Sequence, residues 1–168
     1  MAYDFTKKLQ PIGQADTMSC WAACISWWTL AMAMTRSGGR WGQDQLSLLS
    51  EFGHLVSGDG GMSTSAIRRV CEDSKIRAKI KYITPAEFKS YENLGGPLIV
   101  IFKYPEVGGT HMNVIFSQVG KTVGCMEPYY PMNPSNGRFV GKYFRRNLSF
   151  FCGAQEVGIG FAKEDDWS

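Results

Sequence analysis

The stretch "GQADTMSCWAACISWW", residues 13–28, joins a polar, turn-prone segment to a long apolar one. Residues 19–34 are apolar around almost the whole helical period, which predicts a helix buried on most of its faces. Ser19 can cap this helix, so that Cys20 stands in its first turn. The unpaired N–H groups and the positive dipole end of a helix favour an anion there, as a thiolate nucleophile requires. The stretch therefore predicts both the central helix of the fold and a candidate nucleophile.

Three further helices are predicted before Gly95, where the hydrophobic period changes. They are expected at residues 43–53, 63–74 and 84–88. Gly53 can end the first of them, and Ser63 or Thr64 can begin the second. The third opens on "TPAE", which reads as a capping box with proline in the first helical position.

After Gly95 and Gly96 the pattern is typical of strands separated by glycine, proline and asparagine turns. The expected strands span residues 97–104, 111–119, 122–129, 138–144 and 155–162. The first is a continuous apolar run, which indicates a buried strand. Helices followed by a mostly antiparallel sheet predict an α+β fold, and we expect residues 1–168 to form a single domain.

The composition is that of an ordinary globular protein, with 44% apolar and 20% charged residues. The net charge of +3 is spread along the chain, so we expect no nucleic-acid partner. No run approaches the roughly 18 apolar residues of a membrane span. The start "MAYDFTKKLQP" lacks the apolar core of a signal peptide, which predicts a protein made in the cytoplasm without one.

The chain has five cysteines, at positions 20, 24, 71, 125 and 152. An odd count leaves at least one of them unpaired within a monomer. None lies in a C-x-x-C pair, and His54 and His111 lack the spacing of zinc ligands, so no metal site is expected. Cys71 and Cys152 read as buried thiols, and Cys24, one helical turn beyond Cys20, reads as a core residue.

His111 is the candidate general base for Cys20. It follows the glycine turn "EVGGT" and opens a predicted strand, which places it at the mouth of that strand, where it is expected to contribute little to packing. The other histidine, His54, lies in the loop-like "FGHL".

Glu127 is the candidate for orienting the imidazole. It follows His111 by 16 residues (127 − 111), and the short turn "VGKT" would bring both to the same end of a hairpin. A carboxylate in that place accepts the second ring N–H and fixes the tautomer. Asn113 is the alternative for this role.

Gln14 lies six residues before Cys20 (20 − 14), in the preceding loop. Its amide can donate a hydrogen bond to the oxyanion that forms when Cys20 attacks a carbonyl. Together with Cys20, His111 and Glu127, it would complete a site for acyl transfer.

Gln14, a short gap and then "SCWAAC", with Trp21 directly after the cysteine, resemble the active-site segment of papain-like cysteine proteases. The later "GGTHMNVIF" and "MEPYYP" resemble the His and Asp-Pro segments of the compact bacterial branch of that family. The branch includes bacteriocin-leader-processing peptidases and effector proteases that bacteria inject into other cells. The similarity extends over roughly residues 10–130.

The resemblance implies a papain-like fold, a peptide or protein substrate, a place for Trp21 beside that substrate, and no cofactor. This sequence departs from the family pattern at one residue. The residue that orients the histidine is usually Asp or Asn, and in this chain the candidate is Glu127. The sequence carries no recognisable transporter domain or pro-segment, so we expect a free-standing hydrolase or a delivered toxin domain. Delivery would then need a specialised secretion system, and an immunity or inhibitor protein is an expected partner.

Two other functions stay open. The same site can serve a cell-wall peptide amidase, or a deamidase or transferase acting on glutamine, although amidases of the NlpC type commonly use a second histidine as third residue. The other alternative is a catalytically inactive binding module, against which the four candidate residues argue.

Overall fold

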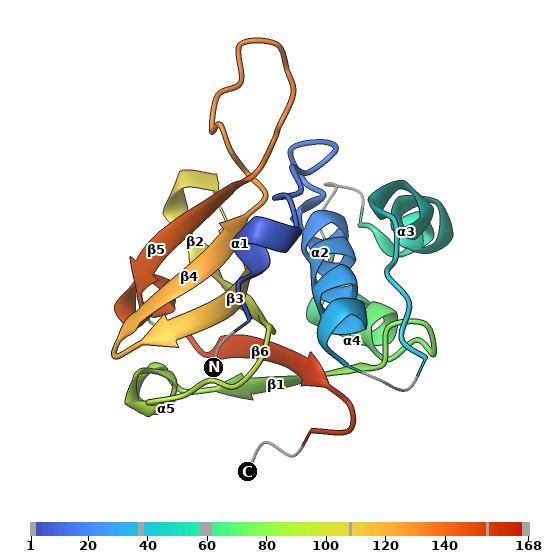
Figure 1. Ribbon diagram of the computed structural model, residues 1–168. Coiled ribbons are helices and arrows are strands. Elements are labelled where there is room, and N and C mark those ends of the chain that lie inside the picture. Colours follow the sequence, from blue (N-terminus) through green and yellow to red (C-terminus); the bar gives the residue numbers. More distant parts are fainter. Residues whose placement is uncertain (1–2, 37–38, 58–61, 108, 154, 166–168) are drawn as a thin grey trace.

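The computed structural model describes residues 3–36, 39–57, 62–107, 109–153 and 155–165. The helices lie mainly in the first half of the chain, and α2 is the longest of those described (Figure 1). They are α1 (Phe5–Lys8), α2 (Cys20–Thr35), α3 (Gln45–Phe52), α4 (Thr64–Cys71) and α5 (Pro85–Ser90), with single 3₁₀ turns η1 (Gly53–Leu55), η2 (Pro105–Val107) and η3 (Leu148–Phe151).

Six strands form one sheet in the order β1-β6-β2-β3-β4-β5, and every pairing is antiparallel. The strands are β1 (Ala78–Ile83), β2 (Leu98–Tyr104), β3 (Gly109–Val119), β4 (Thr122–Glu127), β5 (Lys142–Asn147) and β6 (Val157–Ala162). The last strand therefore inserts between the first two. In Figure 1, α2, α3 and α4 gather to the right of the strands β2–β5.

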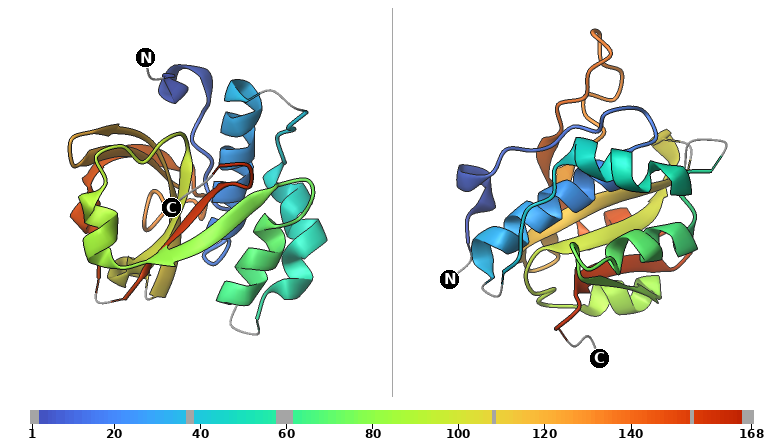
Figure 2. Two further views of the ribbon diagram at one scale, coloured as in Figure 1. Left: turned by 90° about the horizontal axis from the view of Figure 1, so that it is seen from below. Right: turned by 90° about the vertical axis from the view of Figure 1, so that its right-hand side faces the viewer.

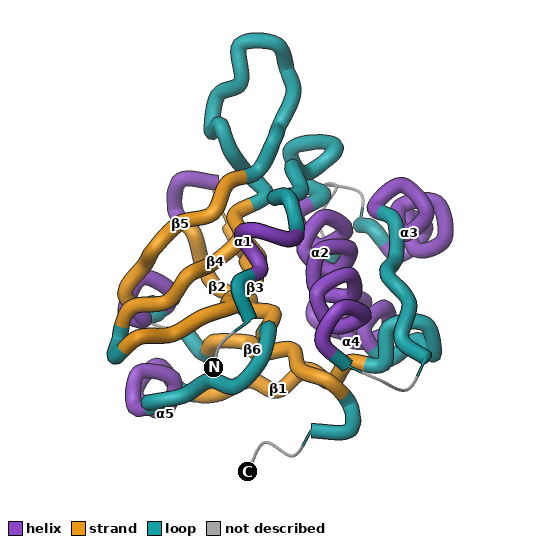
Figure 3. The backbone as a smooth tube through the Cα atoms, viewed as in Figure 1, coloured by secondary structure: helices purple, strands orange, loops and turns teal. Residues whose placement is uncertain are grey.

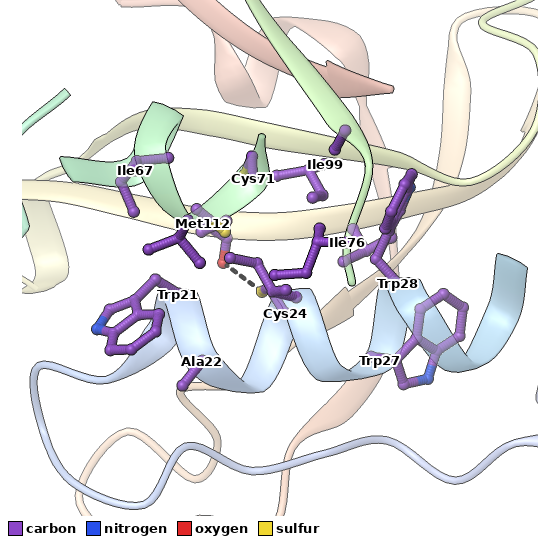
Figure 4. Packing of buried hydrophobic residues seen from close by; sticks show 14 of the residues in the cluster. Trp21, Ala22, Cys24, Trp27, Trp28, Ile67, Cys71, Ile76, Ile99 and Met112 are labelled. Carbon is purple, nitrogen blue, oxygen red and sulfur yellow. Dashed lines mark hydrogen bonds between the residues drawn. The ribbon is translucent and has the colours of Figure 1, made fainter. Parts of the chain in front are cut away.

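Each face of the sheet has its own core. On one face, α2 packs its tryptophans and alanines against side chains of β2 and β3, as Figure 4 shows around Cys24 and Met112. On the other face, Phe88 of α5 and Phe151 of η3 pack against the alternate side chains of the same strands. Burying each large apolar side chain contributes about 1.5–3 kcal/mol, which explains why a helix apolar all round occupies the centre of the molecule.

The loop between β4 and β5, residues 128–141, projects far beyond the sheet (Figure 2). Its base lies beside the segment that leads into α2, and Figure 3 shows both loops at the same end of the molecule. The Gln14 N–H donates to the Pro128 carbonyl at 3.1 Å. A Cβ on Gly13 would come within 2.1 Å of the Phe139 carbonyl oxygen, so only glycine permits this approach. The loop therefore fixes the backbone just ahead of Cys20.

The α+β prediction is confirmed, with several differences in detail. Two elements were not predicted: α1, and β1, which pairs with β6. The strand predicted at 138–144 begins only at Lys142, because Gly137 and Gly141 adopt positive φ angles of 71° and 72° and residues between them belong to the loop. α3 ends before Gly53, its C-cap, as predicted, and Gly53 has a right-handed conformation (φ −58°) from which η1 begins.

The predicted helix starts are correct at α4 and α5, where Ser63 and Thr84 each accept a backbone N–H three residues on. Ser19 precedes α2 as expected, but its side chain makes no capping hydrogen bond. The stretch "SGDGGM", residues 57–62, reads as a glycine-rich connector. This stretch and the predicted turn before His111 fall partly on residues 58–61 and 108, which lie outside the described residues.

Candidate active site

Cys20 is the first residue of α2, and its side chain is half-buried. It stands at the rim of a cavity of about 390 Å³ that it shares with His111. The described lining comes from the loop before α2, from α4 and from the ends of β2 and β3. It includes Met18, Met62, Ile67, Ile101 and Val107 among its apolar members. The candidate nucleophile is thus open to a ligand from the side of this cavity.

His111 is the third residue of β3, opposite Phe102 of β2. It lines the same cavity as Cys20 of α2, whose side chain helps to raise its pKa, and its ring hydrogen-bonds through Nε2 with Oε2 of Glu127 at 2.5 Å. The sulfur, the imidazole and the carboxylate therefore follow one another in the order that a nucleophile, its base and an orienting acid require.

We expected the His111 side chain to contribute little to packing, and the structure shows the opposite. Its side chain is 2% exposed. Its ring lies 5.8 Å from the ring of Phe102, 5.4 Å from that of Tyr104 and 6.1 Å from that of Tyr129, measured between centroids. β3 is an interior strand of the sheet, so the strand end that carries the histidine is enclosed by its neighbours. His111 is thus both a site residue and a packed one.

Burial by itself would lower the pKa of His111, but the hydrogen bonds with Cys20 and Glu127 raise it to about 9. Burial would raise the pKa of Glu127, but the hydrogen bond and charge of His111, with further hydrogen bonds, lower it to about 2. At neutral pH the imidazole is protonated and the carboxylate ionised. An imidazolium and a helix N-terminus both stabilise negative charge on the neighbouring sulfur.

Glu127 ends β4, and its two carboxylate oxygens have separate partners. Oε2 accepts from His111 and from the Tyr129 N–H at 3.0 Å. Oε1 accepts from Asn113 Nδ2 at 3.1 Å and from Arg146 Nη1 at 2.9 Å. The ring of His111 thus contacts Glu127, while Asn113 holds the carboxylate from the side.

Arg146 was not found among the sequence candidates. It lies on β5, and its side chain reaches the site only because β5 pairs with β4. The sequence signal was present, since "FRRN" is the densest basic cluster of the chain, but nothing in it indicated which arginine turns inward.

Gln14 is 2% exposed and lies in the loop that leads to Cys20. Its Nε2 donates to the Asp16 carbonyl at 2.7 Å, and its Oε1 is buried without a hydrogen-bond partner. An amide nitrogen carries two hydrogens, so one remains after the bond to Asp16.

Trp21 does not lie where the resemblance implied. It is 2% exposed and belongs to the apolar core between α2 and the sheet (Figure 4). It points into that core because it follows Cys20 on a helix whose faces are nearly all covered, and it is absent from the described lining of the cavity.

The other cysteines are structural in their placement. Cys24 is fully buried and donates its S–H to the Met112 carbonyl at 3.3 Å, and burial raises its pKa well above the usual value. Burial also raises the pKa of Cys71 and of Cys125 to about 12. Cys152 differs from the expectation because it is only half-buried. Among the described residues no group of His, Cys, Asp or Glu gathers in a way that could hold a metal ion.

Within the same described ranges, no helix has both the length and the apolar character needed to cross a membrane. No protein-family model and no curated protein sequence matches this chain.

Two solved structures show the same fold. The peptidase domain of Streptococcus ComA, a bi-functional ABC transporter involved in a quorum-sensing pathway, superposes with a TM-score of 0.58 at 16% identity, covering 89% of this chain and 95% of that one. A double glycine motif protease from an AMS/PCAT transporter, solved in complex with its leader peptide, gives a TM-score of 0.53 at 16% identity, covering 90% and 96%. The chain therefore shares the papain-like fold of these transporter peptidase domains, which confirms the resemblance drawn from its motifs.

Proposed function

We propose that this chain is a papain-like cysteine peptidase that cleaves peptide bonds through a covalent acyl-enzyme. The observation that carries the proposal is that Cys20, at a helix N-terminus, shares a cavity with His111, whose ring is hydrogen-bonded to Glu127. The shared fold with two peptidase domains supports it.

In the first half of the reaction, the Cys20 sulfur attacks the carbonyl carbon of the scissile bond, and a tetrahedral oxyanion forms. Collapse of this intermediate breaks the C–N bond, and the protonated His111 gives its proton to the leaving amine. In the second half, His111 takes a proton from water, which attacks the thioester and releases the acid. Glu127 stabilises the imidazolium and keeps its ring in place throughout.

The oxyanion is proposed to bind the remaining Nε2 hydrogen of Gln14 and the backbone N–H of Cys20. The placement of Gln14 supports this role, because its backbone is held by Pro128 and its amide by Asp16, so that little reorganisation is needed. A donor fixed before the reaction is worth more than one that must be ordered during it.

The substrate is proposed to be a polypeptide that places an uncharged side chain in the cavity beside Cys20. Apart from Cys20 and His111, the described lining residues are uncharged, and six of them are apolar: Met18, Met62, Ile67, Ile101, Val107 and Met112. One structural neighbour was solved with a leader peptide, which supports a peptide as the ligand of this surface.

We further propose a biological role as an effector or toxin domain that cleaves a protein of another cell after delivery by a specialised secretion system. An immunity or inhibitor protein would then cover the cavity in the producing cell. The motifs "SCWAAC", "GGTHMNVIF" and "MEPYYP", which resemble those of injected effector proteases, support this role.

The test compares cells that make the wild type, Cys20→Ala or the matched control Cys24→Ala, a buried cysteine one turn along the same helix. New protein N-termini should appear with the wild type and with Cys24→Ala, and not with Cys20→Ala. Release of muropeptide fragments, or conversion of glutamine to glutamate without new N-termini, would instead identify an amidase or a deamidase. New N-termini that persist in Cys20→Ala would contradict the assigned nucleophile.

A further inference from the structure

Arg146 contacts the proposed catalytic acid, Glu127, as protonated His111 does, but it takes no part in the proposed reaction. Its side chain is 9% exposed, although guanidinium groups are rarely buried without a partner. It lies within an aromatic enclosure, 4.6 Å from the ring centre of Phe144, 4.1 Å from that of Phe150 and 5.9 Å from that of Tyr104. The neighbouring Arg145 on the same strand is exposed.

The guanidinium joins two members of the site. Its Nη1 donates to Asn113 Oδ1 at 2.5 Å and to Glu127 Oε1 at 2.9 Å. Asn113 in turn donates from Nδ2 to the same carboxylate oxygen and to the Met112 carbonyl. The hydrogen bonds at both Oδ1 and Nδ2 therefore fix the orientation of the Asn113 amide. The Oε1 atom of Glu127 is held by two side chains, Asn113 from β3 and Arg146 from β5.

The charges lead to the same conclusion. Glu127 is 2% exposed, and its carboxylate is ionised at neutral pH because its pKa is lowered to about 2. An uncompensated buried charge is costly, and a paired one much less so. Arg146, whose Nη1 lies 2.9 Å from Glu127 Oε1, gives this carboxylate a second cationic partner besides His111.

We propose that Arg146 is a positioning residue of this peptidase: it pairs with the Oε1 atom of Glu127 and holds the carboxylate in the orientation in which Oε2 meets His111. The inference rests on the proposed function. Arg146 touches neither Cys20 nor the cavity in the contacts that the described residues make, so it acts through Glu127.

Loss of this cation should change the titration of the site in a defined direction. Removing a positive charge makes protonated His111 less repelled, so the pKa of His111 should rise from about 9. Because the pKa of Glu127 begins at about 2, that carboxylate stays ionised at neutral pH in the variant. The other titratable groups that face this cluster are unchanged by the substitution: Cys20 and Cys24 from α2, Tyr104 from β2, Cys125 from β4 and Tyr129 from the following loop.

The test follows the histidine resonances of ¹³C-labelled protein by NMR as a function of pH, together with kcat/KM on one peptide substrate. The chain has two histidines, so His54 serves as an internal reference. In Arg146→Met, the pKa of His111 should rise by about one pH unit, and kcat/KM should fall about tenfold to a hundredfold, the range found when an orienting partner of a site histidine is lost.

Two matched variants separate positioning from packing. Arg146→Lys keeps the charge and should return the titration of His111 to that of the wild type, with partial recovery of kcat/KM because an ammonium lacks the planar fork. Arg145→Met, which removes an exposed cation from the same strand, should change neither quantity.

Each outcome decides the inference. An unchanged titration of His111 in folded Arg146→Met overturns it, as does an equal effect of Arg145→Met. If Arg146→Met does not fold, the double variant Arg146→Met/Glu127→Gln removes the pair together and should be the more stable of the two; equal failure of both overturns the inference. A shifted titration in a protein that cleaves no peptide would support the role of Arg146 and refute the peptidase function.

Discussion

Alternate residues of β3 face two different environments. Met112 and Val114 belong to the apolar core that α2 covers. On this face the Cys24 S–H of α2 donates a hydrogen bond to the Met112 carbonyl (Figure 4). His111 and Asn113 lie on the opposite face and contact Glu127. Because side chains of a strand alternate between faces, one segment of four residues, 111–114, contributes to both the core and the site.

The two faces of β3 differ in how a substitution affects them. Apolar packing is non-directional, so a lost methyl group costs in proportion to the volume removed. On the polar face each buried group depends on a particular partner, and removing one leaves another unpaired. Along α2 the same contrast separates Cys20, which contacts His111, from Cys24, one turn later in the core.

The largest effect is expected from His111→Gln. The amide replaces the imidazole at similar size but cannot carry a proton, so kcat/KM should fall by roughly 10⁴-fold or more. Turnover of a peptide substrate measures the loss, and circular dichroism checks the fold. A variant that remains folded and keeps more than a tenth of the wild-type rate would show that the base lies elsewhere.

Glu127→Gln should reduce kcat/KM by about 10²- to 10⁴-fold, because the amide still meets the imidazole but no longer stabilises the imidazolium. Glu127→Ala should cost more. Asn113→Ala removes a hydrogen bond to Glu127 Oε1 at 3.1 Å and one from Arg146, but leaves the His111–Glu127 contact in place, so kcat/KM should fall about tenfold.

The kcat/KM values of the three variants on one substrate show which residue, Glu127 or Asn113, contributes more to turnover. If Asn113→Ala were the most damaging of the three, Asn113 and not Glu127 would be the third member of the site.

Val114→Ala tests the apolar face of the same strand. The side chain is fully buried in the core beside α2, and the loss of two methyl groups should lower the free energy of unfolding by about 2 kcal/mol. Chemical denaturation measures this change, while kcat/KM should stay at the wild-type value. A large loss of rate in the folded protein would mean that the two faces are coupled through the strand.

The smallest expected effect is a change with pH in the stability that His111 and Glu127 contribute to the fold. The pKa of His111 is raised from 6.5 to about 9, so its stabilising contribution is complete below pH 6.5 and is lost as the pH rises toward 9. The pKa of Glu127 is lowered from 4.5 to about 2, so its contribution is complete above pH 4.5 and is lost as the pH falls toward 2.

The difference in thermal midpoint between the wild type and the double variant His111→Gln/Glu127→Gln should therefore be greatest between pH 4.5 and 6.5. Midpoints recorded by circular dichroism across that window and on both sides of it provide the measurement. A difference that does not vary with pH would show that the pair does not titrate as described.

The elements that the sequence predicted are those with a strong local pattern. The apolar period of α2, the continuous run of β2 and the caps at Ser63 and Thr84 are all encoded within a few residues. β1 escaped prediction although "AKIKYI" alternates, because its pairing partner β6 lies some eighty residues away and only that pairing makes it a strand of the sheet.

The identities of Cys20, His111, Glu127 and Gln14 could be argued from the sequence by itself, because residue type, spacing and turn chemistry are local properties that a motif can carry. The tertiary structure decided how deeply His111 is buried, that Trp21 belongs to the core, and that Arg146 rather than Arg145 reaches Glu127. These facts depend on which strands pair and which face each one turns inward. That pairing is fixed by the burial of side chains far apart along the chain, a free-energy contribution that no local stretch of sequence contains.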